Sequence, residues 1–154
     1  MRILVTSDSH GNTHNLRRAI MSQPSASLIV HLGDGEQDVQ DLIPEFPERQ
    51  FIGVRGNNDW SSTLPLEGEI TVEQVKIFYT HGHKYNVKYG LYDFICEARR
   101  RHAHVALFGH THTPCIDYDD GLYLMNPGAL SGWDCSYGTL DLSPQGIVSN
   151  IITI

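Results

Sequence analysis

Five short polar segments of this sequence each follow an apolar run, and each carries side chains that can bind a metal ion or exchange a proton. In chain order they read DSHGN at 8–12, GDG at 33–35, GNND at 56–59, HGH at 81–83 and GHTH at 109–112. One segment alone is weak evidence, because an Asp after a strand commonly caps the next helix. Five in succession, each containing a glycine that permits a tight turn, indicate one common metal site.

The donors in these segments are carboxylate, amide and imidazole groups, with no thiolate among them. They are Asp8, His10, Asp34, Asn57, His81, His110 and His112. Such hard to borderline ligands suit Mn²⁺, Fe, Co²⁺ or Zn²⁺ better than Cu(I) or an iron–sulfur cluster. Seven donors are too many for one such ion, so they indicate two ions that share one donor.

The first half of the chain alternates between strand and helix patterns. Runs rich in β-branched residues predict strands at 2–7, 27–33 and 50–56, and apolar residues at helical spacing predict helices at 14–23 and 36–46. This alternation is typical of right-handed parallel crossovers. In open α/β sheets, ligands collect outside the carboxyl ends of the strands, where the polar segments begin.

The second half contains more antiparallel signals. A hairpin is predicted around Glu73–Gln74, followed by a helix at 88–102, a buried strand at 104–112 and two hairpins that turn at 119–121 and 144–146. Together the two halves predict an α/β sandwich whose second sheet is mixed and partly antiparallel. The last strand lies either at a sheet edge, where it can pair between subunits, or inside the second sheet.

Composition limits the class of protein further. The 154 residues contain no linker or repeat, so we expect a single domain over 1–154. A formal net charge of −7 opposes general binding to nucleic acid or to an anionic membrane. Three cysteines without a CxxC pair fit free thiols in a reducing compartment, and no apolar run is long enough to span a membrane. We therefore expect a cytoplasmic protein.

The ordered motifs D-x-H, GD, GN-x-D, H-G-H and G-H-x-H resemble those of the calcineurin-like metallophosphoesterases, and the short chain is similar to their small YfcE-type phosphodiesterase branch. The segment NPGAL at 126–130 resembles the NPGS-type segment of that branch. The resemblance implies a metallophosphoesterase-type α/β sandwich of two mixed β-sheets flanked by helices. It also implies that Asp8, His10 and His112 hold one metal ion, that Asn57, His81 and His110 hold the other, and that Asp34 bridges the two.

The reaction implied by this resemblance is hydrolysis of a small phosphodiester by a hydroxide that bridges two divalent ions. Mn²⁺ is the first choice of cofactor, with Fe, Ni²⁺, Co²⁺ or Zn²⁺ as alternatives. Many relatives have His where this chain has Asn58. An amide can orient a phosphate oxygen but cannot protonate a leaving group near neutral pH. The resemblance implies that Asp34 and Asn58 act in catalysis, and we expect Asn58 and His83 to contact the substrate.

Two other functions compete with this interpretation. One is a metal-binding interaction scaffold without catalysis, as in the retromer small subunit, because a fold alone does not establish activity. The other is a nuclease, which would need a basic track that this acidic chain lacks. The expected partners are thus a small phosphoester and a second copy of the chain in a homodimer, with neither a membrane nor nucleic acid.

Overall fold

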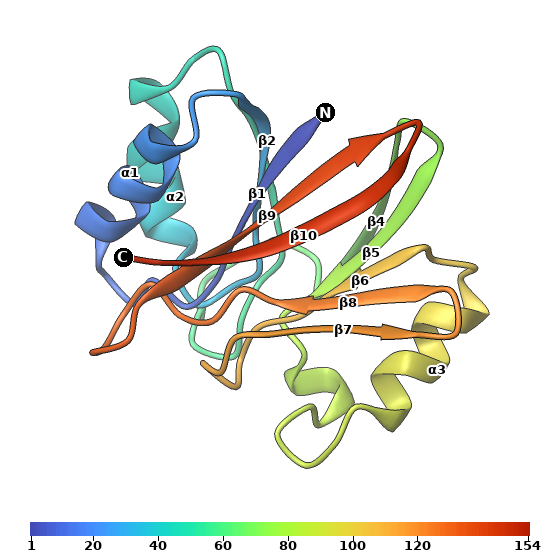
Figure 1. The fold of residues 1–154 in the computed structure, drawn as a ribbon. Helices are drawn as coiled ribbons and strands as arrows, with labels where there is room; N and C mark the ends of the chain where they lie inside the picture. Colours follow the sequence, from blue (N-terminus) through green and yellow to red (C-terminus); the bar gives the residue numbers. More distant parts are fainter.

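The computed structural model of residues 1–154 contains two mixed β-sheets of five strands each. The two sheets pack against each other at the centre of the molecule (Figure 1). The first sheet has the strand order β10-β9-β1-β2-β3. Its strands are β1 (Arg2–Thr6), β2 (Ala26–His31), β3 (Gln50–Gly53), β9 (Ser136–Ser143) and β10 (Gly146–Thr153). Strands β1, β2 and β3 are parallel, whereas β9 and β10 are antiparallel to their neighbours.

The second sheet has the strand order β4-β5-β6-β8-β7. Its strands are β4 (Glu67–Val72), β5 (Val75–Thr80), β6 (Val105–Leu107), β7 (Cys115–Asp119) and β8 (Leu122–Asn126). The three central strands β5, β6 and β8 are parallel, and the two edge strands are antiparallel to them. The expected sandwich of two mixed sheets is therefore confirmed, and the first sheet is as mixed as the second.

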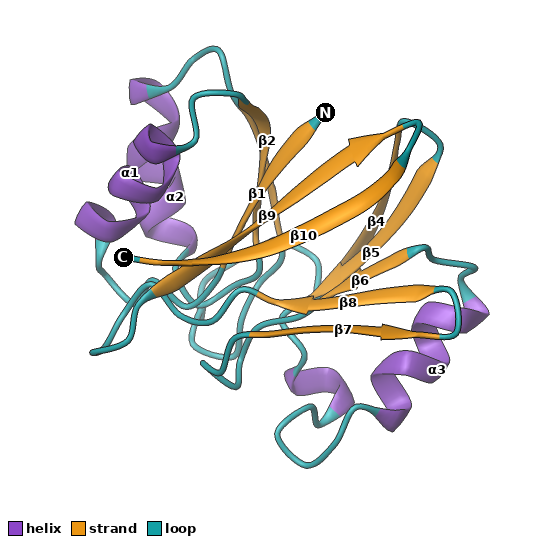
Figure 2. Cartoon of the chain, viewed as in Figure 1, coloured by secondary structure: helices purple, strands orange, loops and turns teal.

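Alternation along β1 shows how the layers form. Ile3 and Val5 point into the core between the two sheets, whereas Leu4 points to the opposite face and packs against the helices. Helices α1 (Thr13–Ser22) and α2 (Glu36–Leu42) cover that outer face, and a 3₁₀ turn, η1 (Ile43–Glu45), extends α2. Helix α3 (Tyr92–Arg100) covers the outer face of the second sheet, so helices flank both sheets (Figure 2).

Several element boundaries differ from the sequence prediction, among them the start of α3 and both ends of β6. Helix α3 begins at Tyr92 rather than at residue 88, because the chain first passes through a 3₁₀ turn, η2 (His83–Tyr85), and left-handed or extended positions at Asn86 and Gly90. The strand predicted at 104–112 pairs only over Val105–Leu107. The residues that follow this short strand form the loop that carries two of the expected donors.

The C-terminal hairpin belongs to the first sheet. Strand β10 pairs only with β9 and lies at the edge, so the alternative that placed it inside the second sheet is wrong. Pairing between copies along this edge stays a prediction. Cys96, Cys115 and Cys135 are free thiols, as expected. None of the helices has the length and apolar character needed to cross a membrane.

Candidate metal centre

The seven expected donors come from five loops that follow β1, β2, β3, β5 and β6, and the structure brings all seven to one place. The parallel order of β1, β2 and β3 places their carboxyl ends at the same edge of the first sheet. Strands β5 and β6 are likewise parallel in the second sheet. The site thus lies where the carboxyl ends of both sheets meet.

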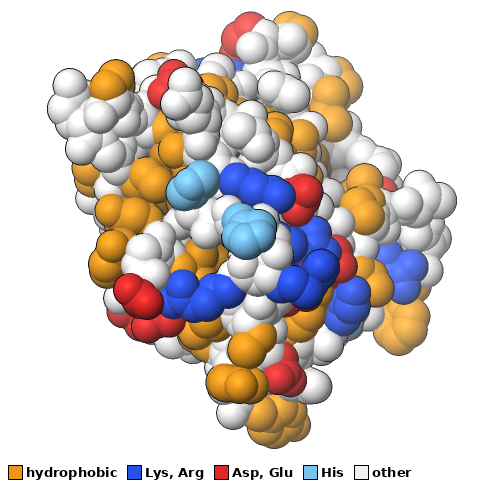
Figure 3. Space-filling model, turned by 90° about the vertical axis from the view of Figure 1, so that its right-hand side faces the viewer, with side chains coloured by type: hydrophobic (Ala, Val, Ile, Leu, Met, Phe, Trp, Pro, Cys, Tyr) orange, Lys and Arg blue, Asp and Glu red, His pale blue; other side chains and the backbone are white.

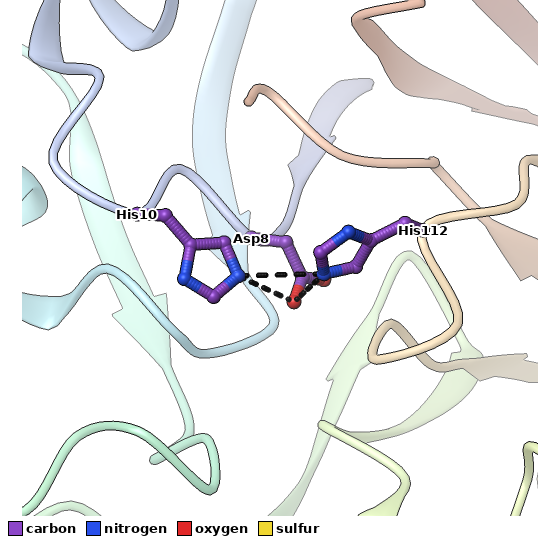
Figure 4. A group of neighbouring side chains, drawn as sticks. All are labelled: Asp8, His10 and His112. Carbon is purple, nitrogen blue, oxygen red and sulfur yellow. Dashed lines mark hydrogen bonds and ion pairs between the residues drawn. The ribbon is translucent and has the colours of Figure 1, made fainter. Parts of the chain in front are cut away.

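Asp8, His10 and His112 form the first group of donors (Figure 4). Asp8 Oδ1 lies 3.0 Å from His112 Nε2 and 3.4 Å from His10 Nε2, and the two imidazole nitrogens are 3.3 Å apart. Ligands that sit about 2.1 Å from one divalent ion lie roughly 3 to 3.5 Å from each other. The three atoms therefore have the spacing of ligands around a single ion.

His81 is the centre of the second group. Its Nε2 lies 2.9 Å from Asn57 Oδ1, 3.1 Å from His110 Nδ1 and 3.4 Å from Asp34 Oδ2. Its Nδ1 lies 2.6 Å from the carbonyl oxygen of Leu32, which can only accept a hydrogen bond, so Nδ1 carries the proton. In the neutral ring, Nε2 then directs a lone pair at the Asn57 oxygen, an arrangement that a shared cation would stabilise.

Asp34 lies between the two groups. Its Oδ2 is 3.4 Å from His81 Nε2 in the second group and 3.7 Å from His10 Nε2 in the first. The carboxylate is buried, and its two oxygens accept hydrogen bonds from the backbone N and the Nδ2 of Asn58. This is the position that a ligand shared by two ions requires, and the donor set of oxygen and imidazole groups fits two divalent cations.

The titratable groups of the site shift one another's pKa values. Burial opposes ionisation of Asp34, but the adjacent His81 and the hydrogen bonds from Asn58 outweigh it and hold the pKa of Asp34 far below its usual range. Burial lowers the pKa of His81, yet the carboxylates of Asp34 and Asp8 raise it overall. Burial, together with His81, lowers the pKa of His110 to about 4, so this ring is neutral and has a free lone pair at physiological pH.

Residues 1–144 match the family model of the calcineurin-like phosphoesterase superfamily domain. The chain belongs to this superfamily. A phosphodiesterase of Methanocaldococcus jannaschii is 28% identical to it, with 86% of each chain covered. The phosphodiesterase YfcE of Escherichia coli K12 is 27% identical, with 98% of this chain and 97% of YfcE covered. These relatives place this chain in the small YfcE-type phosphodiesterase branch, as its motifs predicted.

Solved structures show the same fold. A predicted phosphoesterase from Streptococcus pneumoniae superimposes with a TM-score of 0.82 at 24% identity, covering 99% of this chain and 88% of that one. The Vps29 protein of Entamoeba histolytica, solved in complex with zinc, superimposes with a TM-score of 0.77 at 19% identity and 99% coverage of both chains. The family and its named phosphodiesterases support a metal-dependent phosphoesterase.

The metallophosphoesterase holds its donors in unusual backbone conformations. Five of the seven expected donors have positive φ angles, namely Asp8 (53°), His10 (44°), Asp34 (55°), His110 (67°) and His112 (60°). Few non-glycine residues adopt this left-handed region, and such residues cluster at functional sites. Gly56 gives the carboxylate of Asp34 the room it needs, because a Cβ at this position would lie 2.0 Å from Asp34 Oδ1.

Two buried polar residues that the sequence analysis did not single out hold the donor loops in place. Asp38 accepts hydrogen bonds from Ser9 Oγ (2.6 Å), Gly11 N (2.9 Å) and Thr13 Oγ1 (3.1 Å), and these residues flank His10. Nothing in the sequence distinguishes Asp38 from an ordinary acidic residue of a helix. Its role depends on α2 packing beside α1, which only the folded chain reveals.

Asn126 performs the same task for the loop that carries His110 and His112. Its Nδ2 donates to the carbonyl oxygen of Gly109 and to Thr111 Oγ1, both at 3.0 Å, and its Oδ1 accepts from Gly128 N at 2.9 Å. Asn126 opens the segment NPGAL, whose resemblance to the family was the only signal that could have drawn attention to it.

The remaining expected site residues lie around the centre. Asn58 donates from its backbone N and from Nδ2 to the two oxygens of Asp34, each at 2.8 Å. The ring of His83 is half-buried, and its centroid lies 5.4 Å from that of His81. Burial and the charge of His81 lower the pKa of His83. Asp59 accepts hydrogen bonds from the backbone N–H groups of Asp34, Gly35, Glu36 and Gly56, so it joins the loop after β3 to the loop after β2.

Proposed function

We propose that this chain is a dinuclear phosphodiesterase that hydrolyses small phosphodiesters. Asp8, His10 and His112 would hold one divalent ion, Asn57, His81 and His110 would hold the other, and Asp34 would be shared. The observation that carries the proposal is the position of Asp34 Oδ2, within 3.7 Å of ligand nitrogens in both groups. We propose Mn²⁺ as the first choice of metal, because oxygen and imidazole donors without thiolate suit it.

When bound, two divalent ions activate a water for attack on phosphorus and neutralise charge on the phosphate oxygens. The chain's own residues prepare this site in three ways. The carbonyl of Leu32 keeps the proton of His81 on Nδ1, so that Nε2 is free to bind. The backbone N–H of His110 donates to Asp8 Oδ2 at 3.1 Å and orients that carboxylate. Asn58 orients Asp34 through both of its oxygens.

Asn58 also limits which esters the site can hydrolyse. It is exposed beside Asp34, where its amide can reach a phosphate oxygen, but an amide has no proton to give to a departing alkoxide. Asp59 cannot replace the missing acid, because both of its oxygens accept backbone hydrogen bonds. We therefore propose that esters of acidic alcohols such as phenols are better substrates than alkyl esters.

The decisive experiment measures hydrolysis of bis(p-nitrophenyl) phosphate by metal-stripped protein, with and without added Mn²⁺. Asp34→Asn should lower the Mn²⁺-dependent rate by at least about a hundredfold, because loss of an outer partner of a metal ligand already costs about ten- to a hundredfold. Asp117→Asn is the matched control, since this Asp is exposed on β7 and its substitution changes charge equally. It should retain the wild-type rate.

A scaffold function is the competing candidate, and the similarity to Vps29 favours it. The same experiment separates the two functions when calorimetry records metal binding in parallel. Measured binding without turnover in Mn²⁺, Ni²⁺, Co²⁺ or Zn²⁺ would overturn the phosphodiesterase proposal and support the scaffold. Turnover that survives in Asp34→Asn would overturn the shared-ligand assignment.

A nuclease function has less support from the surface. Lys and Arg side chains gather on the face shown in Figure 3, but carboxylates lie among them. The arginines at 99–101 are paired with acidic residues: Arg99 with Asp119, Arg100 with Glu97, and Arg101 with Glu67, Glu69 and Glu97. A cation that already faces a carboxylate attracts a phosphate backbone less strongly, so we propose a small substrate.

A further inference from the structure

A polar cavity of about 310 Å³ adjoins the candidate metal centre. Asn58 belongs to both, because it lines the cavity while its backbone N and its Nδ2 donate to Asp34. The other walls include the first turns of α2, with Glu36, Gln37 and Gln40, and the loop that carries Trp60. A phosphodiester bound at the metal centre could therefore extend one of its two alcohol groups into this cavity.

The cavity presents several free hydrogen-bond acceptors. Three side-chain amides line it, and one N–H of each NH₂ group donates to a carboxylate, which leaves the other N–H free: Gln37 donates to Asp41 (2.8 Å), Gln40 to Glu36 (3.0 Å) and Asn58 to Asp34 (2.8 Å). The carbonyl oxygens of these amides and the second oxygen of Glu36 remain as acceptors. Such a lining matches a ligand group that donates several hydrogen bonds.

The charged residues in the cavity lining favour a positively charged ligand group. No Lys or Arg lines the cavity, which disfavours a second phosphate, whereas Glu36 contributes a carboxylate that is not paired with a cation. The indole of Trp60 is the one aromatic group in the lining, and it is 88% exposed. An exposed indole next to a carboxylate favours a cation, because the electron-rich face of the ring attracts positive charge.

We infer that this cavity binds the protonated amine of an amino alcohol, so that, among phosphodiesters with the same leaving group, those whose other alcohol is of the aminoethyl type bind most tightly. A primary ammonium group supplies three donors for the free acceptors and a positive charge for Glu36 and Trp60. The inference rests on the proposed function for the binding of the phosphate. It adds the chemical class of one ester group, which the metal centre alone does not select.

The experiment compares two dialkyl phosphates that differ only at the position of the charge. Calorimetry measures the Kd of the Mn²⁺-loaded protein for 2-aminoethyl methyl phosphate and for propyl methyl phosphate, whose terminal methyl group replaces the ammonium group. We expect the aminoethyl ester to bind about tenfold more tightly, the combined effect of one exposed ion pair and one cation–π contact. Binding is read directly, so a protein that binds but does not hydrolyse leaves this test intact.

Two variants locate the effect within the cavity. Glu36→Gln and Trp60→Leu should each reduce the tenfold ratio of the two Kd values to about threefold. Glu73→Gln removes the same charge at the exposed turn between β4 and β5, so it should leave the ratio unchanged. Equal affinity of the two esters in the wild type, or a ratio that Glu36→Gln does not lower, would overturn the inference.

Discussion

Replacing Asn126 by Ala should weaken metal binding without removing any ligand. The side chain is fully buried and joins three groups: the carbonyl of Gly109, the hydroxyl of Thr111 and the N–H of Gly128. Its loss leaves the buried Gly109 carbonyl and Gly128 N–H without these partners, and each such group costs about 1–3 kcal/mol. We expect a total loss of about 3 kcal/mol and, for a domain of this size, a Tm lower by roughly 6 to 12 °C.

The functional effect follows from the position of the contacts. Gly109 and Thr111 are the neighbours of His110 on either side, so Asn126 orients the loop that presents one donor to each proposed ion. Loss of a residue that orients metal ligands typically lowers metal affinity by about ten- to a hundredfold. Calorimetric titration of the metal-stripped variant with Mn²⁺ measures this change, and thermal unfolding measures the Tm.

Ser136→Ala separates positioning from simple destabilisation. Ser136 is also buried and donates to the carbonyl of Pro127 at 2.7 Å, within the same segment, and its side chain makes no hydrogen bond to residues 109–112. It should lower the Tm while the Mn²⁺ affinity stays within about twofold of the wild type. If Asn126→Ala lowers the Tm and leaves the Mn²⁺ affinity equally unchanged, Asn126 supports the fold alone and the reasoning is refuted.

Three further predictions each concern a single residue. With Asn58 unable to act as an acid, kcat/KM for an aryl phosphodiester should exceed that for a dialkyl phosphodiester by at least about a hundredfold, and similar values would contradict the proposed role. Asp59→Ala leaves four backbone N–H groups around Asp34 without their acceptor and should lower the free energy of unfolding, measured by urea unfolding, by about 3 kcal/mol. As the control, Asp93→Ala at an exposed position should change it by less than about 0.5 kcal/mol. Burial lowers the pKa of His31 from 6.5 to about 4, so the unfolded chain binds a proton that the folded chain does not. The free energy of unfolding should therefore decrease as the pH falls from about 6.5 to 4. Urea unfolding of the metal-stripped protein measures this dependence, and the slope of the free energy against pH should be shallower in His31→Gln. An unchanged slope would show that His31 does not titrate in this way.

The sequence predicts where the expected donors lie in the fold, because their positions follow from local patterns. An apolar run that stops at a polar, glycine-containing segment marks the carboxyl end of a strand, and parallel strands end at one edge. This logic located Asp8, Asp34 and Asn57 after three neighbouring strands of the first sheet. The same rule applies to His81 and His110, because β5 and β6 are also parallel neighbours.

The sequence does not predict the residues that support the donors, because these act through contacts between distant parts of the chain. Asn126 is 15 residues from Thr111 and reaches it only after β8 has paired with β6. Asp38 is 27 residues from Gly11 and meets it only when α2 packs beside α1. The early start predicted for the third helix had a local cause, since residues 88–91 fit the helical pattern while Gly90 has a φ of +145°.

The backbone of the site shows why so many supporting contacts are needed. A left-handed conformation costs a non-glycine residue roughly 1–2 kcal/mol, and Asp8, His10, Asp34, His110 and His112 all adopt it. Such conformations persist only where the surroundings impose them. Asp38, Asp59 and Asn126 each join several groups of these loops, and they account for how the chain holds its donors together before any ion binds.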